Sequence, residues 1–249
     1  MFHGEQAGHV PRGTEPIDPQ IPTTDEEFET ARESISLGLV TLGYDREPAV
    51  LDRLARLATL LSSWAPRMNL TGHRGADTIA RRLILDALAL INVLPDFEKL
   101  VDLGSGAGFP GLPIAILFPG RTVVSVEARS RRVSFQKTVI RELALENVTI
   151  LLGRMESLDP VLADGVVAQA VAPPERILDL MLPWCVDGGW LAIPGSADPL
   201  SSPPPAAASH TQSAELCYRV PLGGADRRVW MARKSAQQPT AEQISEIER

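Results

Sequence analysis

The chain has 249 residues, of which 44% are hydrophobic and 22% charged, with a formal net charge of −7 at pH 7. This composition is typical of one globular domain of about 200 residues with loose ends. The net charge argues against a general affinity for nucleic acid but leaves room for a local basic face. Cys185 and Cys217 lack the spacing of metal ligands, so we predict no metal site and a reduced, cytoplasmic setting. No apolar run reaches the roughly 18 residues of a membrane span, and we expect no membrane partner.

The first part of the chain predicts a helical N-terminal extension over 25–95. The preceding segment, 1–24, is rich in Pro, Gly and polar residues and is expected to be disordered. Apolar residues at helical spacing predict three helices, which are 25–42, 47–64 (ended by Pro66) and 76–94 (ended before Pro95).

Strands and helices alternate over 96–235, which predicts a parallel sheet with crossover helices and a Rossmann-like α/β domain. The expected strands are 99–103, 122–127, 148–152, 165–171 and 189–193. The expected helices are 110–118, 130–145 and 174–183. A Pro-rich stretch at 194–208 predicts a mobile loop, and 236–249 predicts a polar tail. Two runs near the end, 214–220 and 227–233, are expected to pair as a closing antiparallel hairpin.

Residues 100–111, Leu-Val-Asp-Leu-Gly-Ser-Gly-Ala-Gly-Phe-Pro-Gly, carry the strongest functional signal. A strand containing Asp102 breaks into a glycine-rich turn and then enters a helix. Gly104, Gly106 and Gly108 lack Cβ atoms, so the turn can be tight and a ligand can touch the backbone. A dinucleotide pattern starting at Gly104 fails, since its third glycine falls on a phenylalanine. A pattern starting at Gly106 fits but begins two residues late relative to the strand end, whereas the D-x-G-x-G-x-G pattern from Asp102 resembles motif I of the class I methyltransferases. We therefore favour S-adenosylmethionine as the cofactor and keep a nicotinamide dehydrogenase as an alternative.

Residues after the next two strands complete the expected cofactor site. Glu127 ends the second strand about 20 residues past the glycine turn, where an acid can bind both ribose hydroxyls. Met155 and Glu156 follow the third strand, and resemblance to class I methyltransferases implies an adenine contact in that turn. The alternative interpretation of Glu127, Met155 and Glu156 is that they are ordinary strand-end residues that contact no ligand.

Two basic stretches are candidates for binding phosphate groups. Residues 121–141 carry six cationic side chains against Glu127 alone, and 67–82 carry a similar excess. Within them we single out Arg129, Arg131, Arg132 and Arg82 as candidate RNA contacts. The alternative is a pair of solvated helix faces.

The order of these motifs resembles the small-subunit ribosomal RNA methyltransferase G family, over roughly residues 47–195. The resemblance is carried by the 101–113 stretch VDLGSGAGFPGLP, by Asn69-Leu70-Thr71 upstream of it, and by Val126-Glu127 and Gly153-Arg154-Met155-Glu156 downstream. It implies the class I S-adenosylmethionine-dependent methyltransferase fold and methylation of a guanine N7 in 16S rRNA of the small ribosomal subunit. The cofactor contacts it implies are Gly104, Phe109, Met155 and Glu156, with Glu127 at the ribose. We add to this expected cofactor site Asp102, Gly106, Gly108 and Gln169.

The implied reaction needs little from the protein's side chains. Guanine N7 is a bare lone pair, so no proton has to leave before it attacks. We therefore assign no catalytic residue and expect positioning and charge arrangement to dominate. We further expect a monomer.

Three polar groups that the family usually has are missing. Gln169 stands in place of an arginine, Pro194 in place of a lysine and Leu83 in place of a histidine. A neutral amide cannot supply a fixed cation or a bidentate fork. Two further alternatives therefore stay open: action on another RNA or a small molecule, and a non-catalytic cofactor-binding role in ribosome assembly. We interpret His73 and His210 as solvated, and leave Asp86 open between lining the site and an ordinary helix surface.

Overall fold

The computed structural model describes residues 24–169, 174–195 and 211–235. The predicted disorder of 1–24 falls almost entirely outside these residues. The greater part of the predicted loop (196–208), the predicted tail (236–249) and His210 lie outside them too. Within the described part of the chain, no helix combines the length and the apolar character needed to cross a membrane.

The first two helices follow the sequence pattern, with one correction. Helix α1 (Asp25–Leu42) begins at Thr24, whose Oγ1 accepts the amide of Glu27, and ends at Gly43 with φ of +82°. Helix α2 (Pro48–Met68) continues past Pro66, where the sequence predicted its end. Pro66 lies in the last turn, where its missing N–H removes one bond near the end of the helix.

The third helical segment is not one regular helix. It consists of α3 (Ala76–Ile79), a π-helical segment (Ala80–Ile84) and α4 (Leu85–Ile91). The π-helical segment includes Arg82 and Leu83, and such wide turns often occur at functional sites. The prediction of one helix over 76–94 was therefore right in position and wrong in regularity.

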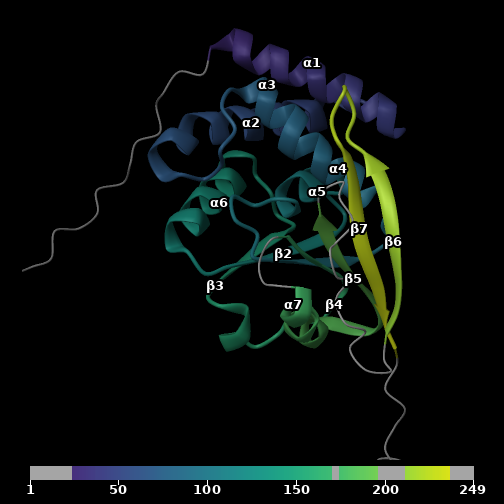
Figure 1. The fold of residues 1–249 in the computed structure, drawn as a ribbon. Coiled ribbons are helices and arrows are strands. Elements are labelled where there is room, and N and C mark those ends of the chain that lie inside the picture. The colour runs from purple at the N-terminus through teal and green to yellow at the C-terminus, as the bar shows by residue number, and fades with distance from the viewer. Residues whose placement is uncertain (1–23, 170–173, 196–210, 236–249) are drawn as a thin grey trace, which may run out of the picture.

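In the described part of the chain, seven strands form one sheet in the order β3-β2-β1-β4-β5-β7-β6, and Figure 1 shows the closing pair along one edge. The first five strands are parallel, and β7 is antiparallel to both of its neighbours. The strands are β1 (Lys99–Leu103), β2 (Thr122–Glu127), β3 (Val148–Leu152), β4 (Ala163–Ala168), β5 (Cys185–Gly195), β6 (Thr211–Arg219) and β7 (Asp226–Lys234). This topology confirms the Rossmann-like fold and the closing hairpin.

Strand β5 is longer than its sequence pattern indicates. Pro194 and Gly195, predicted to open a loop, pair instead with Val229 and Arg228 of β7. The pairing of β5 with β4 ends at Ala192, so Pro194 lies at the strand's end, where a missing N–H is tolerated. The hairpin therefore reaches the same end of the sheet as the glycine loop.

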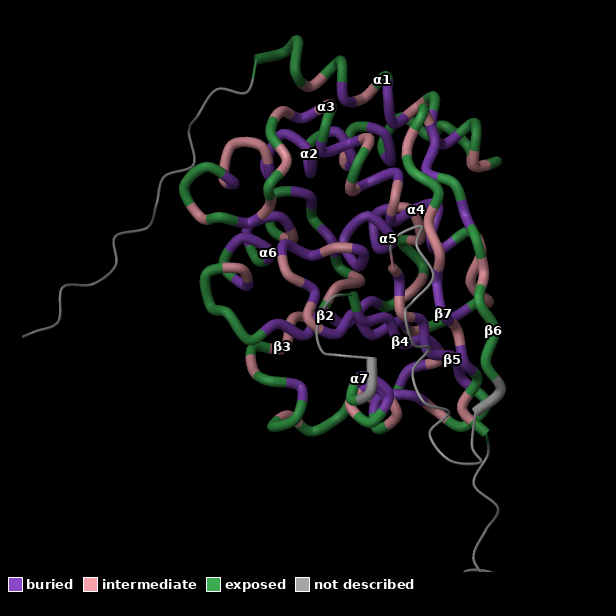
Figure 2. Tube along the Cα trace, viewed as in Figure 1, coloured by how far each residue is buried: buried purple, intermediate pink, exposed green. Residues whose placement is uncertain are grey.

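Helices cover both faces of the sheet, as Figures 1 and 2 show. Alternate residues of β1 point to opposite faces: Leu100 packs into the cluster of α4 and α5 (Gly111–Leu117), while Val101 and Leu103 pack into that of α7 (Pro174–Met181). Helix α6 (Ser130–Glu142) joins α1, α2 and α5 in a third cluster, so the N-terminal helices share their core with the crossover helices.

Candidate functional site

The glycine loop between β1 and α5 is fastened to its neighbours by hydrogen bonds. The amides of Gly104 and Ser105 donate to the carbonyl of Val126 at 2.8 and 3.1 Å. From α6, the Gln136 amide donates to Ser105 Oγ and to the carbonyl of Gly106, both at 2.8 Å. No motif in the sequence singles out Gln136, which is fully buried. These bonds fix the shape of the loop before any ligand arrives.

All three loop glycines have positive φ, and for Gly106 and Gly108 the structure shows different reasons. A Cβ on Gly108 (φ +90°) would lie 2.2 Å from Leu112 Cδ1, so this glycine permits close packing inside the protein. A Cβ on Gly106 (φ +59°) would meet nothing nearer than Arg132 Nη1 at 3.7 Å. Gly106 therefore leaves an open face on which a ligand can approach the backbone.

Asp102 lies inside the protein rather than on this open face. Its side chain accepts the Gly111 amide at 2.9 Å, and the residue is 1% exposed. Burial raises the pKa of Asp102 to about 7; the bond from Gly111 opposes this rise and the charge of Glu127 adds to it. We therefore assign Asp102 to holding the start of α5 against β1, and not to the predicted cofactor contact.

Glu127 lies directly beside the loop, as the cofactor interpretation requires. Its Oε2 accepts the amide of Gly106 at 2.9 Å and its Oε1 accepts the amide of Arg129 at 2.8 Å. Arg132 Nη1 lies 3.5 Å from Oε2. The structure thus brings a predicted ribose ligand onto the loop glycine, and it places Arg132, predicted to bind RNA, beside that carboxylate.

The remaining candidates follow the ends of the next two strands. Met155 and Glu156 form a 3₁₀ turn after β3; the side chain of Met155 is buried and that of Glu156 is exposed. Gln169 is exposed directly after β4. The carboxyl ends of four adjacent parallel strands therefore carry Gly104, Glu127, Met155 and Gln169 along one edge, where open α/β sheets bind ligands.

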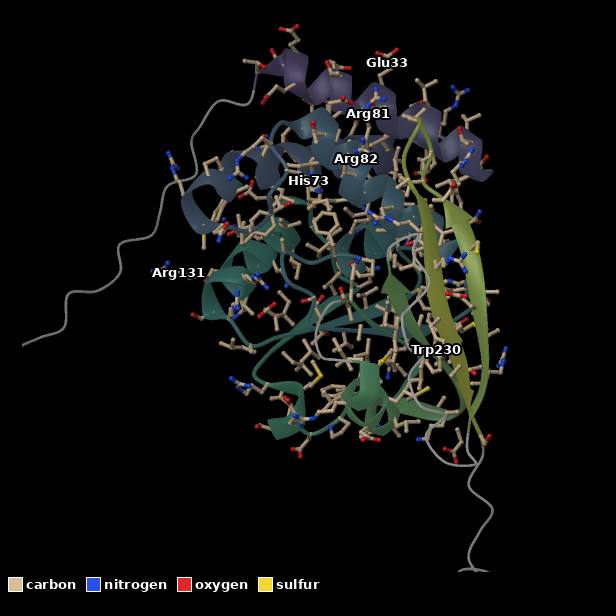
Figure 3. All side chains as sticks on the ribbon, viewed as in Figure 1. Glu33, His73, Arg81, Arg82, Arg131 and Trp230 are labelled. Atoms are coloured by element: carbon tan, nitrogen blue, oxygen red, sulfur yellow. The ribbon has the colours of Figure 1, made fainter. Side chains whose placement is uncertain are left out.

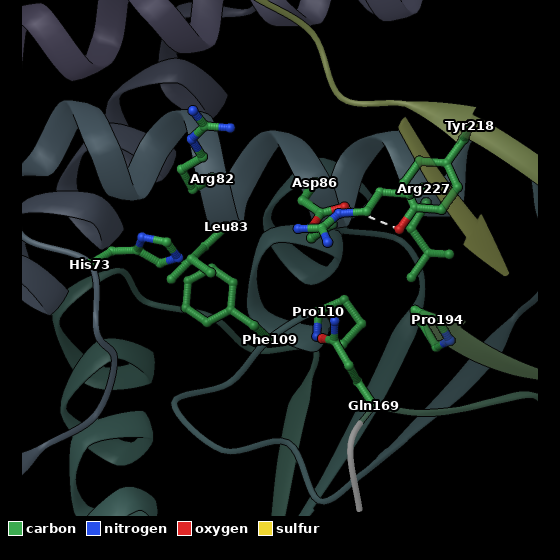
Figure 4. Close-up of a pocket in the computed structure, with 12 residues that line it drawn as sticks. His73, Arg82, Leu83, Asp86, Phe109, Pro110, Gln169, Pro194, Tyr218 and Arg227 are labelled. Carbon is green, nitrogen blue, oxygen red and sulfur yellow. Dashed lines mark hydrogen bonds and ion pairs between the residues drawn. The ribbon is translucent and has the colours of Figure 1, made fainter. Parts of the chain in front are cut away.

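A cavity of about 100 Å³ lies beside the loop, drawn in Figure 4. It is lined by Phe109 and Pro110 of the loop and by residues from α4, β5 and the closing hairpin. All three departures from the family pattern, Leu83, Gln169 and Pro194, line this one cavity. The three positions at which we expected a departure from the family pattern therefore lie in one pocket.

A side-chain network forms one wall of this cavity. Tyr218 Oη donates to Asp86 Oδ1 at 3.0 Å, and Arg227 Nη2 lies 3.1 Å from Asp86 Oδ2. Burial raises the pKa of Asp86, while Arg227 and Tyr218 act in the opposite direction. Within the described residues, Arg227 Nε is buried and has no hydrogen-bond partner. The sequence left Asp86 open and missed Tyr218 and Arg227. Tyr218 lies 132 positions from Asp86 in the chain and Arg227 lies further still, so neither belongs to a local motif with it.

The basic stretches do not fold into one patch. Arg121 pairs with Asp96, and Arg81 pairs with Asp77 at 2.9 Å. Arg129 and Arg131 are exposed at the start of α6, and Arg82 is exposed beside the cavity. Figure 3 shows Arg131 at the outer side of α6 and His73 and Arg82 on the N-terminal helical layer. His73, interpreted as solvated, is half-buried and lines the cavity.

Comparison with known proteins gives consistent matches. The family model of rRNA small subunit methyltransferase G matches residues 50–201. The chain is 34% identical over 174 residues to ribosomal RNA small subunit methyltransferase G of Chromohalobacter salexigens, covering 69% of this chain and 83% of that protein. It is 36% identical over 155 residues to the protein of the same name from Azoarcus sp., covering 62% and 73%. Its fold is similar to the crystal structure of MtNAS in complex with MTA and tNA, with a TM-score of 0.50 and 17% identity over 84% of this chain and 70% of that one.

Proposed function

The chain belongs to the rRNA small subunit methyltransferase G family, and we propose that it transfers a methyl group from S-adenosylmethionine to N7 of a guanine in 16S rRNA. The observation that carries this proposal is the glycine loop, in which Gly106 leaves an open face with the Glu127 carboxylate beside it. We propose that the cofactor binds at the edge of the sheet that carries the glycine loop, and that the acceptor guanine approaches next to the cofactor.

The residues present fit the cofactor. The open face at Gly106 is a cradle that a side chain would fill, and Glu127 keeps acceptor capacity beyond its two amide bonds. We propose that Gly104, Gly106 and Phe109 lie along the cofactor, that Glu127 binds the ribose, and that Met155, Glu156 and Gln169 line the rest. Gly108 serves the same site through the packing of the loop. Bound there, S-adenosylmethionine supplies a methyl group on a positively charged sulfur.

The chain's own residues then act by positioning. Guanine N7 carries a lone pair and no proton, so no side chain has to act as a general base. A fixed acceptor beside a fixed donor converts the transfer into an effectively unimolecular step. The hydrogen bonds that Gln136 and Val126 make to the loop keep the donor side of this arrangement in place.

We propose that exposed arginines hold the RNA backbone. Arg129 and Arg131 at the start of α6, and Arg82 beside the cavity, are solvent-exposed and can each approach a phosphate. Such contacts fix the register of the RNA without reading its sequence. Arg132 is better placed to hold Glu127, its partner at 3.5 Å.

The test uses the purified full chain, labelled S-adenosylmethionine and small ribosomal subunits whose 16S rRNA lacks the modification. We expect label in 16S rRNA, recovered as 7-methylguanosine after digestion. Cofactor binding without label in any RNA would instead support the assembly role, and label in another RNA would identify another substrate. Binding of NADH with no binding of S-adenosylmethionine would end the methyltransferase interpretation.

A further inference from the structure

We propose that the cavity beside the glycine loop receives the acceptor guanine, and that Asp86, held by Tyr218 and Arg227, recognises the edge of the base opposite N7. The inference rests on the proposed function and adds to it a specificity residue. It also assigns a role to the closing hairpin.

The walls of the cavity have different chemistry. Figure 4 shows Phe109 and Pro110 of the glycine loop on one side, and Asp86, Arg227 and Tyr218 on the facing side. Phe109 is also one of the proposed cofactor contacts, so the methyl donor is placed on the loop side of the cavity. A base in the cavity therefore has its reacting atom toward the loop and its other end toward Asp86.

Guanine matches this arrangement. Its N7 and its C2 amino group lie at opposite ends of the ring system, so a base with N7 toward the loop presents N1–H and the amino group to the facing wall. The Asp86 carboxylate accepts one bond from Tyr218 and one from Arg227, and about two of its lone-pair sites remain. Those sites can accept the two guanine donors. Adenine has an acceptor at N1 and no C2 amino group, so it does not match.

Arg227 supplies a cation on the wall facing the loop. Its Nη2 is held by Asp86, while its buried Nε has no hydrogen-bond partner within the described residues. Guanine O6 lies between N7 and N1, and a guanidinium fixed on the Asp86 wall can donate to it. The loss of cationic side chains at Gln169 and Pro194 is thus accompanied by a cation from β7 in the same cavity.

Apolar side chains complete the cavity. Leu83, Phe109 and Pro194 line it and can pack against the flat faces of a base. Single-stranded bases are commonly bound in this way, by stacking on apolar or aromatic side chains and hydrogen bonding along one edge. Leu83 and Pro194 thus replace two polar groups with surfaces that suit a planar ring.

The test compares wild type and Asp86→Asn on two 16S rRNAs. One carries guanine and the other inosine at the position that the wild-type protein methylates. Inosine keeps N7, O6 and N1–H and lacks only the C2 amino group. We expect wild type to prefer guanine at least tenfold in kcat/KM, and Asp86→Asn to reduce this preference to threefold or less with S-adenosylmethionine affinity unchanged.

A merely structural role for Asp86 gives a different result, because it lowers activity on both RNAs equally and leaves the guanine-to-inosine ratio at its wild-type value. That result, or a wild-type ratio near one, overturns the inference. A wild-type protein that methylates neither RNA overturns the proposed function instead.

A second variant keeps the test valid should Asp86→Asn fail to fold. Tyr218→Phe removes one donor to the carboxylate and keeps the aromatic ring, and we expect it to reduce the guanine preference at least threefold; an unchanged ratio counts against the inference. The matched control is Arg219→Gln, which breaks the exposed ion pair with Asp226 on the same hairpin. It should leave the ratio at the wild-type value.

Discussion

The two halves of the candidate site are built in different ways. The glycine-loop half comes from two consecutive strand-to-helix units and is held by backbone amides that donate to Val126 and Glu127. The cavity half is assembled from the π-helical segment, α4, β4, β5 and the closing hairpin, and is held by side chains. The first arrangement tolerates little change, since most of its bonds involve the main chain. The second depends on side chains from elements far apart in sequence, and the three positions where we expected departures from the family pattern all lie there.

The largest expected effect is on the open face of the loop. Gly106→Val places a branched side chain where we propose the cofactor lies, at a φ of +59° that a β-branched residue strongly disfavours. We expect S-adenosylmethionine affinity to fall by at least ~1,000-fold, as measured by calorimetric titration.

The control for this variant is Gly223→Val in the turn between β6 and β7. That glycine also has positive φ, +71°, and a Cβ there meets nothing within 4 Å. It should keep wild-type cofactor affinity. If Gly106→Val also kept it, the loop would not be the cofactor site, and the contrast between the two halves would fail.

A second prediction concerns the pH dependence of stability. The pKa of Asp102, raised to about 7 in the folded protein, means that its stabilising contribution is present below about pH 4 and is lost as pH rises through 7. Asp102→Asn removes this loss and keeps an acceptor for the Gly111 amide. The free energy of unfolding of the variant should therefore equal that of wild type at pH 4. At pH 8 it should exceed that of wild type by up to ~4 kcal/mol.

Denaturant unfolding at the two pH values measures this difference. The exposed Asp45→Asn should show no such pH-dependent gain. A variant less stable than wild type at pH 8 would show that Asp102 is needed there as a carboxylate.

A smaller effect is expected at the proposed ribose ligand. Glu127→Gln keeps the shape of the side chain but leaves one acceptor oxygen for the amides of Gly106 and Arg129 and for the ribose. Losing a charge-assisted hydrogen bond costs ~1.5–3 kcal/mol, so we expect S-adenosylmethionine affinity to fall ~10- to 100-fold. The exposed Glu146→Gln is the matched control. If Glu127→Gln bound S-adenosylmethionine within twofold of the wild-type affinity, Glu127 would not be the ribose ligand.

The smallest expected effect separates RNA binding from cofactor binding. Arg131→Ala removes one exposed cation at the start of α6. We expect RNA affinity to fall a few-fold and the slope of log K against log salt to decrease by ~0.7–0.9, with cofactor affinity unchanged. Arg233→Ala, on β7 near Gly188, serves as the control. An unchanged salt dependence for Arg131→Ala would place the RNA on another face.

The sequence alone determined the Rossmann-like fold, the first three strands, the closing hairpin, and the juxtaposition of the glycine loop with Glu127. These features depend on residues close in the chain: hydrophobic periodicity sets the strands, and a strand, a glycine turn and an acid about 20 residues later repeat a local geometry. Only the tertiary structure decided that Asp102 faces inward, that Arg132 approaches Glu127, and that Leu83, Gln169 and Pro194 line one cavity with Asp86, Tyr218 and Arg227. The physical reason is that these relations depend on burial and on contacts between elements far apart in sequence, which no local pattern of residues encodes.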